Sequence, residues 1–247
     1  GHIHIVEPGL QDAMTKAMAT GRLHFTTKPE PADVFIICVQ TPYRETEEHK
    51  RVSDMRFVES AAKEVGSVLR AGNLCVLEST SPPYSTRMVE KIVSETSGLA
   101  PEQFMTAHCP ERIIPGRMLI ELRENDRIIG SNRPESAEFA KEIYEKVVTG
   151  GTIRLTDDLT AEMCKLTENT FRDINIAYAN ELSKVCDRLG IDVFKLIELA
   201  NCHPRVNVHT PGVGVGGHCI AVDPWFIHEK FEDITPLIYE ARLVNDG

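Results

Sequence analysis

The chain has 247 residues, 42% of them hydrophobic and 26% charged, which is enough apolar material for one large domain or two ordinary ones. Lys and Arg total 27 against 37 Asp and Glu, a formal net charge of −10. This balance argues against a nucleic-acid or anionic-membrane binder, because such proteins present a basic face. It leaves room for a small anionic ligand, which a few placed cations and N–H groups can hold.

The seven cysteines are widely spaced and contain no C-x-x-C pair, which argues against a disulfide framework or a metal site. We therefore expect a cytoplasmic protein. No apolar run approaches the roughly 20 residues that cross a bilayer, so no membrane partner is expected. The chain begins without Met and ends inside a helical pattern, from which we expect a fragment truncated at both ends.

The first 155 residues alternate short β-branched runs with amphipathic stretches, which is typical of a mostly parallel, doubly wound sheet. Strands are predicted at residues 23–27, 33–39, 74–78, 104–107, 127–130 and 152–155. The second and third of these are apolar enough to be buried on both faces. Helices are predicted at residues 54–70, at about 85–95 and after Pro134, from their apolar periodicity and end signals.

Residues 157–189 contain neither Pro nor Gly and carry a long apolar stripe, which predicts one helix of about 33 residues, roughly 50 Å long. Gly190 ends it, and a shorter helix is predicted at about 192–201. A helix this long in a small domain usually packs against a partner chain. We therefore expect a homodimer through the helix from Asp157 to Leu189.

Residues 210–226 (TPGVGVGGHCIAVDPWF) contain a literal G-x-G-x-x-G pattern. It is not a dinucleotide fingerprint, because Pro residues interrupt the strand that should precede it and Pro224 cuts into the helix that should follow. We interpret it as a loop whose glycines approach a ligand and aim Cys219 at it. The alternative is a glycine-rich turn beside an inert, buried cysteine.

A catalytic Cys219 would need neighbouring cations or N–H groups to form a thiolate, and Lys165 and the loop amides can supply them. Asp223, four residues later, either orients a water or cation or caps the helix that Pro224 begins. Lys165 and Asn169 share one face of the long helix, flanked by Glu162 and Asp173. A buried Lys–Asn pair can stabilise an alkoxide. A solvated helix face is the simpler alternative.

Polar residues follow three of the predicted strands, at the edge where open α/β sheets bind ligands. Thr41 and Pro42 follow one strand, Ser79 and Thr80 follow the next, and Glu111 follows the third. Ordinary turn chemistry explains any one of them. Together they indicate a ligand site at this edge.

These motifs together resemble the UDP-glucose/UDP-N-acetylmannosamine dehydrogenase family over essentially the whole chain. Residues 216–224 (GGHCIAVDP) resemble the family's catalytic-cysteine loop, and residues 162–169 (EMCKLTEN) resemble its Lys/Asn helix. The resemblance implies an α/β fold with an incomplete Rossmann-like NAD-binding domain at residues 1–155, lacking the first strand and glycine fingerprint. Residues 156–247 would form an all-helical central and dimerisation domain, built on one long helix. A C-terminal UDP-binding domain would be absent.

The resemblance also implies roles for individual residues. The implied catalytic residues are Cys219, Lys165, Asn169, Glu111, Thr80 and Asp223. The implied contacts to the cofactor NAD are Val39, Thr41, Pro42, Ser79 and Thr80. The implied substrate contacts are Glu111, Arg112, Ile113, Lys165, Asn169, Arg205, Gly212, Val215 and Gly216. Among these, Arg205 matches an Arg that reaches a substrate in the neighbouring subunit.

Many UDP-glucose enzymes of the family carry a second Glu where Pro115 stands in this chain. Residues 111–116 (ERIIPG) and the HPRVN and GGHCIAVDPWF segments look more like the UDP-N-acetyl-D-mannosamine branch. UDP-ManNAc is therefore the preferred substrate, ahead of UDP-glucose and UDP-GlcNAc.

The reaction that the resemblance implies oxidises the sugar C6 alcohol twice with NAD, through a Cys219 thioester, to the uronate. One alternative is a two-electron hydroxyacid dehydrogenase of related architecture that needs no cysteine. The other is a fragment that dimerises without turnover. Two NADH released per substrate would favour the first reaction.

Overall fold

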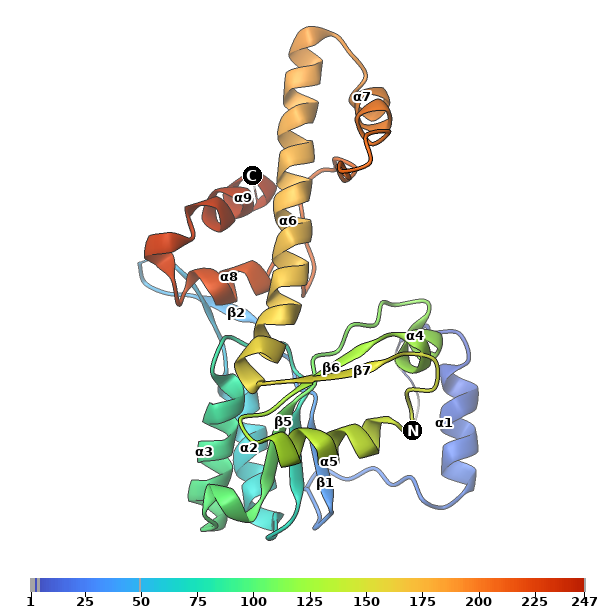
Figure 1. The fold of residues 1–247 in the computed structure, drawn as a ribbon, viewed down its shortest axis with the longest axis vertical. Coiled ribbons are helices and arrows are strands. Elements are labelled where there is room, and N and C mark those ends of the chain that lie inside the picture. The colour runs from blue at the N-terminus through green and yellow to red at the C-terminus, as the bar shows by residue number, and fades with distance from the viewer. Residues whose placement is uncertain (1–2, 4, 49, 247) are drawn as a thin grey trace. The chain divides into compact units, whose positions relative to one another are not determined.

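The computed structural model describes residue 3, residues 5–48 and residues 50–246. The chain forms two compact units, each made of three separate segments (Figure 1). The first unit holds the segment that ends at Gln40, Arg56–Ser79 and Tyr84–Glu162. The second holds Thr41–Met55, Thr80–Pro83 and the segment that begins at Met163. The domain boundary after residue 155 stays a prediction, to which the structure adds that residues 41–55 and 80–83 belong to the second unit.

The first unit is built on a five-stranded sheet with strand order β1-β4-β5-β6-β7. Its strands are Val34–Ile37 (β1), Leu74–Leu77 (β4), Met105–His108 (β5), Arg127–Gly130 (β6) and Ile153–Thr156 (β7). Neighbouring strands pair in parallel, except that β5 and β6 are antiparallel. The prediction of a mostly parallel sheet is confirmed.

Helices cover this sheet on both faces. They are Arg56–Val68 (α2), Ser85–Ser97 (α3) and Pro134–Tyr144 (α5). The unit also contains Met118–Glu124 (α4) and a 3-10 turn at Pro101–Gln103 (η1). Leu74 and Val76 of β4 share a core cluster with residues of α5. Because side chains alternate along a strand, Cys75 and Leu77 face the opposite side, and they are also buried. The strand is therefore buried on both faces, as its apolar sequence predicts.

The strand predicted at residues 23–27 is wrong. These residues are irregular and exposed, and they follow an unpredicted helix, Leu10–Ala19 (α1), which buries none of its side chains. A β-branched run becomes a strand only when a neighbour accepts its hydrogen bonds. In the described part of the chain β1 is the edge of the sheet, and no strand lies beyond it.

Glu162, at the start of the long helix, caps a neighbouring helix. Its carboxylate accepts hydrogen bonds from Thr86 N at 2.7 Å, Thr86 Oγ1 at 2.6 Å and Tyr84 N at 2.7 Å. These donors lie at the N-terminal end of α3, where backbone N–H groups lack helical partners. Burial raises the pKa of Glu162, and the hydrogen bonds oppose that shift. The solvated-face alternative is therefore wrong for Glu162.

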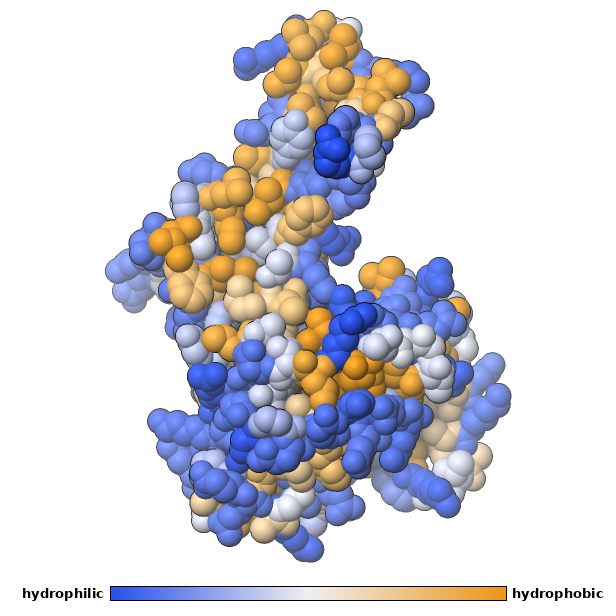
Figure 2. Space-filling view, viewed as in Figure 1, coloured by the Kyte–Doolittle hydropathy of each residue, from blue (hydrophilic) through white to orange (hydrophobic). Residues whose placement is uncertain are grey.

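The second unit is built around the long helix α6, Asp158–Leu189, whose 32 residues correspond to about 48 Å. Val193–Ala200 (α7) follows, with the Asp192 side chain accepting from Phe194 N. Both helices are as predicted. Figure 2 shows apolar residues gathered over α6 and α7, where Leu189, Phe194 and Leu199 are each more than half exposed. In the ranges that the structure describes, no helix has the length and apolar character needed to span a membrane.

The remaining elements of the second unit were not predicted, apart from a helical pattern at the chain's end and a helix beginning at Pro224, which was one of two alternatives. They are the antiparallel strands Tyr43–Glu45 (β2) and Arg51–Ser53 (β3), the helices Asp223–His228 (α8) and Pro236–Asp246 (α9), and the 3-10 turn Glu232–Ile234 (η2). Ser53 N and Oγ donate to the Glu229 carboxylate at 2.6 and 2.8 Å, which fastens the hairpin to α8. The unit is therefore helical except for this hairpin.

Candidate active site

Asn169 and Asp223 form a buried pair in the second unit. Asn169 lies on α6, and Asp223 is the first residue of α8, where Pro224 fits because the first turn needs no N–H donor from it. The Asn169 amide donates to Asp223 Oδ2 at 2.5 Å, and the two residues are 4% and 3% exposed. Asn169 is therefore not on a solvated face, and the Asp223 carboxylate bonds a side chain instead of capping α8.

Asp223 titrates close to neutrality. Burial raises its pKa to about 6, while the Asn169 hydrogen bond and the charge of Lys165 lower it. Lys165 is half-buried on α6, one turn before Asn169. A carboxylate with this pKa can accept and return a proton at neutral pH.

Cys219 lies four residues before the start of α8. Its carbonyl accepts from Val222 N at 3.0 Å and Asp223 N at 2.9 Å, a turn that leaves the cysteine exposed. Partial burial of the sulfur and the charge of Asp223 raise the pKa of Cys219, and Lys165 and Arg172 oppose this by a smaller amount. Lys165 thus acts in the expected direction, but its effect on the pKa of Cys219 is smaller than that of burial.

The glycine loop before Cys219 is anchored to α6 and α9. Gly212 N donates to Asn180 Oδ1 at 2.8 Å, and Val215 N donates to the Asn245 carbonyl at 3.1 Å. Gly214 has φ +120°, and a Cβ at this position would lie 2.8 Å from the Asn245 carbonyl oxygen. Only glycine fits such an approach.

A buried ion pair holds this anchor. Asp173 on α6 accepts from Arg242 on α9 at 2.5 Å, and both side chains are fully buried. Asn245 Nδ2 also donates to Asp173, at 2.8 Å. Burial raises the pKa of Asp173, and the charge of Arg242 lowers it. The solvated-face alternative is therefore wrong for Asp173 as well.

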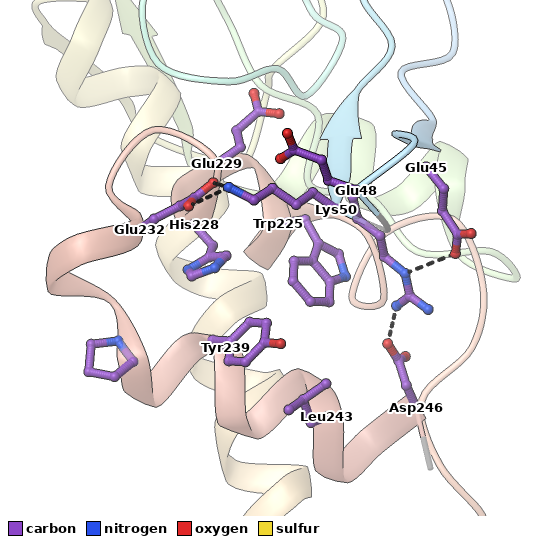
Figure 3. A pocket seen from close by; sticks show the side chains of 12 residues that line it. Glu45, Glu48, Lys50, Trp225, His228, Glu229, Glu232, Tyr239, Leu243 and Asp246 are labelled. Carbon is purple, nitrogen blue, oxygen red and sulfur yellow. Dashed lines mark hydrogen bonds and ion pairs between the residues drawn. The ribbon is translucent and has the colours of Figure 1, made fainter.

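A cavity of about 660 Å³ lies between the β2–β3 hairpin and helices α8 and α9 (Figure 3). Trp225, His228 and Tyr239 form its aromatic side, with His228 stacked on Tyr239 at 5.0 Å between ring centroids. Two ion pairs cross it, Lys50–Glu232 and Arg51–Asp246. The cavity lining includes no predicted site residue.

The residues expected to contact a cofactor follow β1 and β4, which are neighbouring parallel strands. In the first unit Ser79 Oγ donates to the Val39 carbonyl at 2.6 Å. In the second unit Thr41 Oγ1 donates to the Thr80 carbonyl at 2.6 Å, and the Pro42 carbonyl accepts from Asp54 N at 2.8 Å. Within the described ranges the Thr80 hydroxyl has no hydrogen-bond partner, so it is free to hold a water molecule.

Glu111, in the first unit, lies beyond the end of β5. Its Oε1 accepts from Arg112 N at 2.6 Å and Ile113 N at 3.0 Å, and its Oε2 pairs with Arg127 at 2.9 Å. The Arg112 guanidinium donates to the Asp126 carbonyl at 3.0 Å. Glu111, Arg112 and Ile113 are all predicted substrate contacts. Both oxygens of the Glu111 carboxylate are already hydrogen-bonded within the protein.

Arg205 lines a different feature, an apolar groove of about 1010 Å³ along α6 and α7. Phe171, Tyr178 and Leu196 line the same groove, and Phe171 and Tyr178 are more than half exposed. Gly216, by contrast, lies in the glycine loop, and a Cβ added there would have no neighbouring atom within 4 Å.

Sequence reasoning missed four residues that support the site, namely Arg127, Arg172, Asn180 and Asn245. Arg172 lies seven residues after Lys165, two helical turns along the same face, so spacing alone could have indicated it. The other three reach partners on distant segments, and no local pattern signals them. In the described ranges, no group of His, Cys, Asp and Glu could hold a metal ion.

The comparisons with known proteins agree with the motifs. Residues 1–148 match the NAD binding domain of the UDP-glucose/GDP-mannose dehydrogenase family, and residues 159–247 match its central domain. The NDP-N-acetyl-D-galactosaminuronic acid dehydrogenase of Ralstonia solanacearum is 52% identical, covering 99% of this chain and 59% of that protein. The UDP-N-acetyl-D-mannosamine dehydrogenase of Yersinia pestis is 49% identical, and the match covers 100% of this chain and 60% of that protein.

A solved structure of UDP-D-ManNAc dehydrogenase from Pyrococcus horikoshii is similar with a TM-score of 0.92 at 40% identity, covering 99% of this chain and 58% of that one. The chain thus spans about three fifths of the length of the relatives it matches. With both of its parts matched in order, the chain belongs to the UDP-glucose/GDP-mannose dehydrogenase family.

Proposed function

We propose that this chain is the NAD-binding and central part of an NAD-dependent UDP-sugar 6-dehydrogenase that works through a thioester on Cys219. The observation that carries this proposal is the buried Asn169–Asp223 pair at the start of α8, four residues after the exposed Cys219. The turn before α8 and its first residue supply the thiol and a carboxylate with a pKa of about 6, and α6 supplies the amide donor. A nucleophile, a proton acceptor and an oxyanion donor are groups that acyl chemistry at sulfur can use.

The substrate class follows from the relatives. Proteins named for UDP-N-acetyl-D-mannosamine and for NDP-N-acetyl-D-galactosaminuronic acid are each about half identical to this chain. Both names contain a 2-acetamido sugar, which supports UDP-ManNAc over UDP-glucose. UDP-GalNAc belongs in the same substrate panel, because one of the two relatives is named for N-acetyl-D-galactosaminuronic acid.

Each residue has a role that its surroundings support. Lys165 and Asn169 stabilise the oxyanions that form as Cys219 adds to the C6 aldehyde, an effect often worth a few kcal/mol per donor. Oxidation of the resulting thiohemiacetal gives the thioester, and a water held by the Thr80 hydroxyl hydrolyses it. Asp223 accepts the proton of that water, because its pKa leaves it ionised yet basic at neutral pH. The products are the uronate and the free thiol.

NAD, when bound, accepts one hydride in each oxidation, so two NADH form per uronate. The chain's residues fit such a cofactor because the turns after β1 and β4 are tied at one sheet edge, through Ser79 to Val39 and through Thr41 to Thr80. Open α/β sheets bind nucleotides at this edge. Val39, Thr41, Pro42, Ser79 and Thr80 would hold the nicotinamide half and exclude water from it.

We further propose that the protein is a homodimer through α6 and α7. The groove there is lined by large apolar side chains that are half exposed, and contiguous patches of this kind mark protein interfaces. A second copy of the same helix pair offers a matching apolar surface. Arg205 lines this groove, which supports a role at the partner's substrate.

The test is a stoichiometric assay with the full-length protein that contains this chain. With UDP-ManNAc and NAD we expect two NADH per sugar nucleotide and a uronate product, measured by absorbance and mass spectrometry. Cys219→Ser should abolish steady-state uronate formation and leave the thermal unfolding temperature unchanged. One NADH per substrate, or undiminished turnover by Cys219→Ser, would contradict the thioester route and favour a simple hydroxyacid dehydrogenase.

A further inference from the structure

Arg127 is a buried cation that none of the roles above uses. It is the first residue of β6 and only 4% exposed. The antiparallel register of β5 and β6 pairs His108 with Gly130. Extending that register by three residues places Glu111 opposite Arg127. Directly opposed side chains on antiparallel strands lie close enough to interact, and the observed Arg127 Nη2 to Glu111 Oε2 distance is 2.9 Å.

The surroundings of Arg127 hold its guanidinium in one orientation. Its carbon Cζ lies 5.3 Å from the centre of the Tyr144 ring, and Nη1 donates to Cys109 Sγ at 3.8 Å. The Tyr144 hydroxyl donates to the Glu78 carboxylate, which also accepts from Cys38 Sγ at 3.0 Å. The ring is therefore held through its hydroxyl, and the Arg127 guanidinium contacts both the ring and Glu111.

The Glu111 carboxylate is consequently fixed at both oxygens. Oε2 is held by the guanidinium, and Oε1 is held by two successive backbone N–H groups. Its side chain remains 30% exposed, so a lone pair stays open to a ligand. This arrangement suits a carboxylate that accepts a hydrogen bond in a set direction.

We propose that Arg127 is a positioning residue, which orients the Glu111 carboxylate as a fixed acceptor for the substrate or the attacking water. This inference rests on the proposed function, because Glu111 is taken to act in the oxidation of the UDP-sugar. Arg127 touches neither substrate nor cofactor in this role. Its effect on turnover passes entirely through Glu111.

The role makes a specific demand on the side chain. A lysine at this position keeps the positive charge but loses the planar fork that bonds Glu111 and Cys109 together. We therefore expect Arg127→Lys to retain part of the activity and Arg127→Met to lose most of it. A matched control is Arg133→Met, because Arg133 is another mostly buried Arg of the first unit, paired with Glu90 at 2.5 Å.

The experiment is a double-mutant cycle in the full-length protein, measuring kcat and KM for uronate formation together with thermal unfolding. We expect Arg127→Met to lower kcat by roughly thirtyfold or more and Arg127→Lys by roughly threefold to tenfold. Arg133→Met should lower the unfolding temperature with kcat changed less than about twofold. In a Glu111→Gln background, Arg127→Met should lower kcat no further, because residues that act through one another are non-additive.

Three results would overturn the inference, and the first is distinguishable from the other two. If the unmodified protein forms no uronate, the proposed function fails and the role of Arg127 fails with it. If the unmodified protein is active but the Arg127 and Glu111 losses multiply, the function stands and Arg127 is structural only. Equal kcat losses for Arg127→Met and Arg133→Met would likewise make Arg127 structural only.

Discussion

Lys165 acts on two titrating groups at once. Its charge lowers the pKa of both Cys219 and Asp223, against the effect of burial. In Lys165→Met both pKa values should therefore rise, and kcat should fall at least about tenfold, or 1.4 kcal/mol of barrier. The pH dependence of Cys219 alkylation by iodoacetamide measures the first effect. Lys184→Met, on an exposed part of the same helix, is the control and should change neither quantity.

The ionised carboxylate of Asp223 should lower the free energy of unfolding at neutral pH. Its pKa is raised from 3.8 to about 6 in the folded state, so the folded protein binds a proton more tightly than the unfolded chain does. The contribution of protonated Asp223 to the free energy of unfolding is therefore fully present below about pH 4, and it is lost as the pH rises through 6. That gap corresponds to at most about 3 kcal/mol.

Asp223→Asn removes this titration and keeps an oxygen that can accept from Asn169. We expect the variant to be more stable than the unmodified protein at pH 8 and nearly equal to it at pH 4, with activity lost. Urea unfolding at several pH values measures the difference. A variant less stable at pH 8 would show that the ionised carboxylate is net favourable where it lies.

Gly214 offers a test of the loop that is independent of any titration. Gly214→Ala would require a left-handed backbone and place a Cβ 2.8 Å from the Asn245 carbonyl. We expect a loss of about 1–3 kcal/mol and slower turnover, because the loop must shift. Gly216→Ala is the matched control for stability, since nothing lies within 4 Å of a Cβ there. Equal losses of stability in the two variants would argue against the anchor at Asn245.

Among individual residues, the sequence can predict those site residues that lie close together in one local pattern. Lys165 and Asn169 are one helical turn apart, and Cys219 and Asp223 lie in one continuous motif, so spacing made them candidates and the family resemblance gave them roles. Arg127 and Asn245 were missed for a physical reason. Each is defined by a partner brought near by strand register or helix packing, which single-sequence periodicity does not encode.

At the scale of elements, burial decided which predictions were confirmed. β4 and α6 carry patterns strong enough to predict them, a continuous apolar run and an unbroken apolar stripe. The β2–β3 hairpin is short and half exposed, and side-chain bonds to α8 and α9 hold it in place, so its own sequence carries little strand signal. The strand wrongly predicted at residues 23–27 shows the converse, because propensity without a neighbouring strand gives no sheet.

The apolar face of α6 and α7 should be the surface through which two copies of the protein associate. Tyr178→Glu combined with Leu196→Glu puts two charges into the groove, and a buried unpaired charge strongly opposes association. We expect light scattering to show a dimer for the unmodified full-length protein and a monomer for this variant. Lys63→Glu, on an exposed part of α2, should leave the mass unchanged. A dimer that survives both charges would place the interface elsewhere.

At the scale of the whole molecule, the sequence predicted the class of each part better than the path of the chain between them. The alternation of strands and helices and the single long helix follow from periodicity over many residues. Residues 41–55 belong to the second unit with partners that lie about 180 residues later, Glu229 for Ser53 and Asp246 for Arg51. Residues 80–83 join the same unit, where the Thr80 carbonyl accepts from Thr41. Local sequence patterns carry no information on such distant partners.

This interleaving has a consequence for how genes of the family can be shuffled. The chain passes between the two units at five junctions, after residues 40, 55, 79, 83 and 162. A single crossover near residue 156 between two diverged relatives would inherit the hairpin from one parent and α8 and α9 from the other. The hairpin's Arg51 and Ser53 would then meet foreign residues in place of Asp246 and Glu229. Functional chimaeras of this pair of units should therefore be those in which residues 41–55 travel with the C-terminal part.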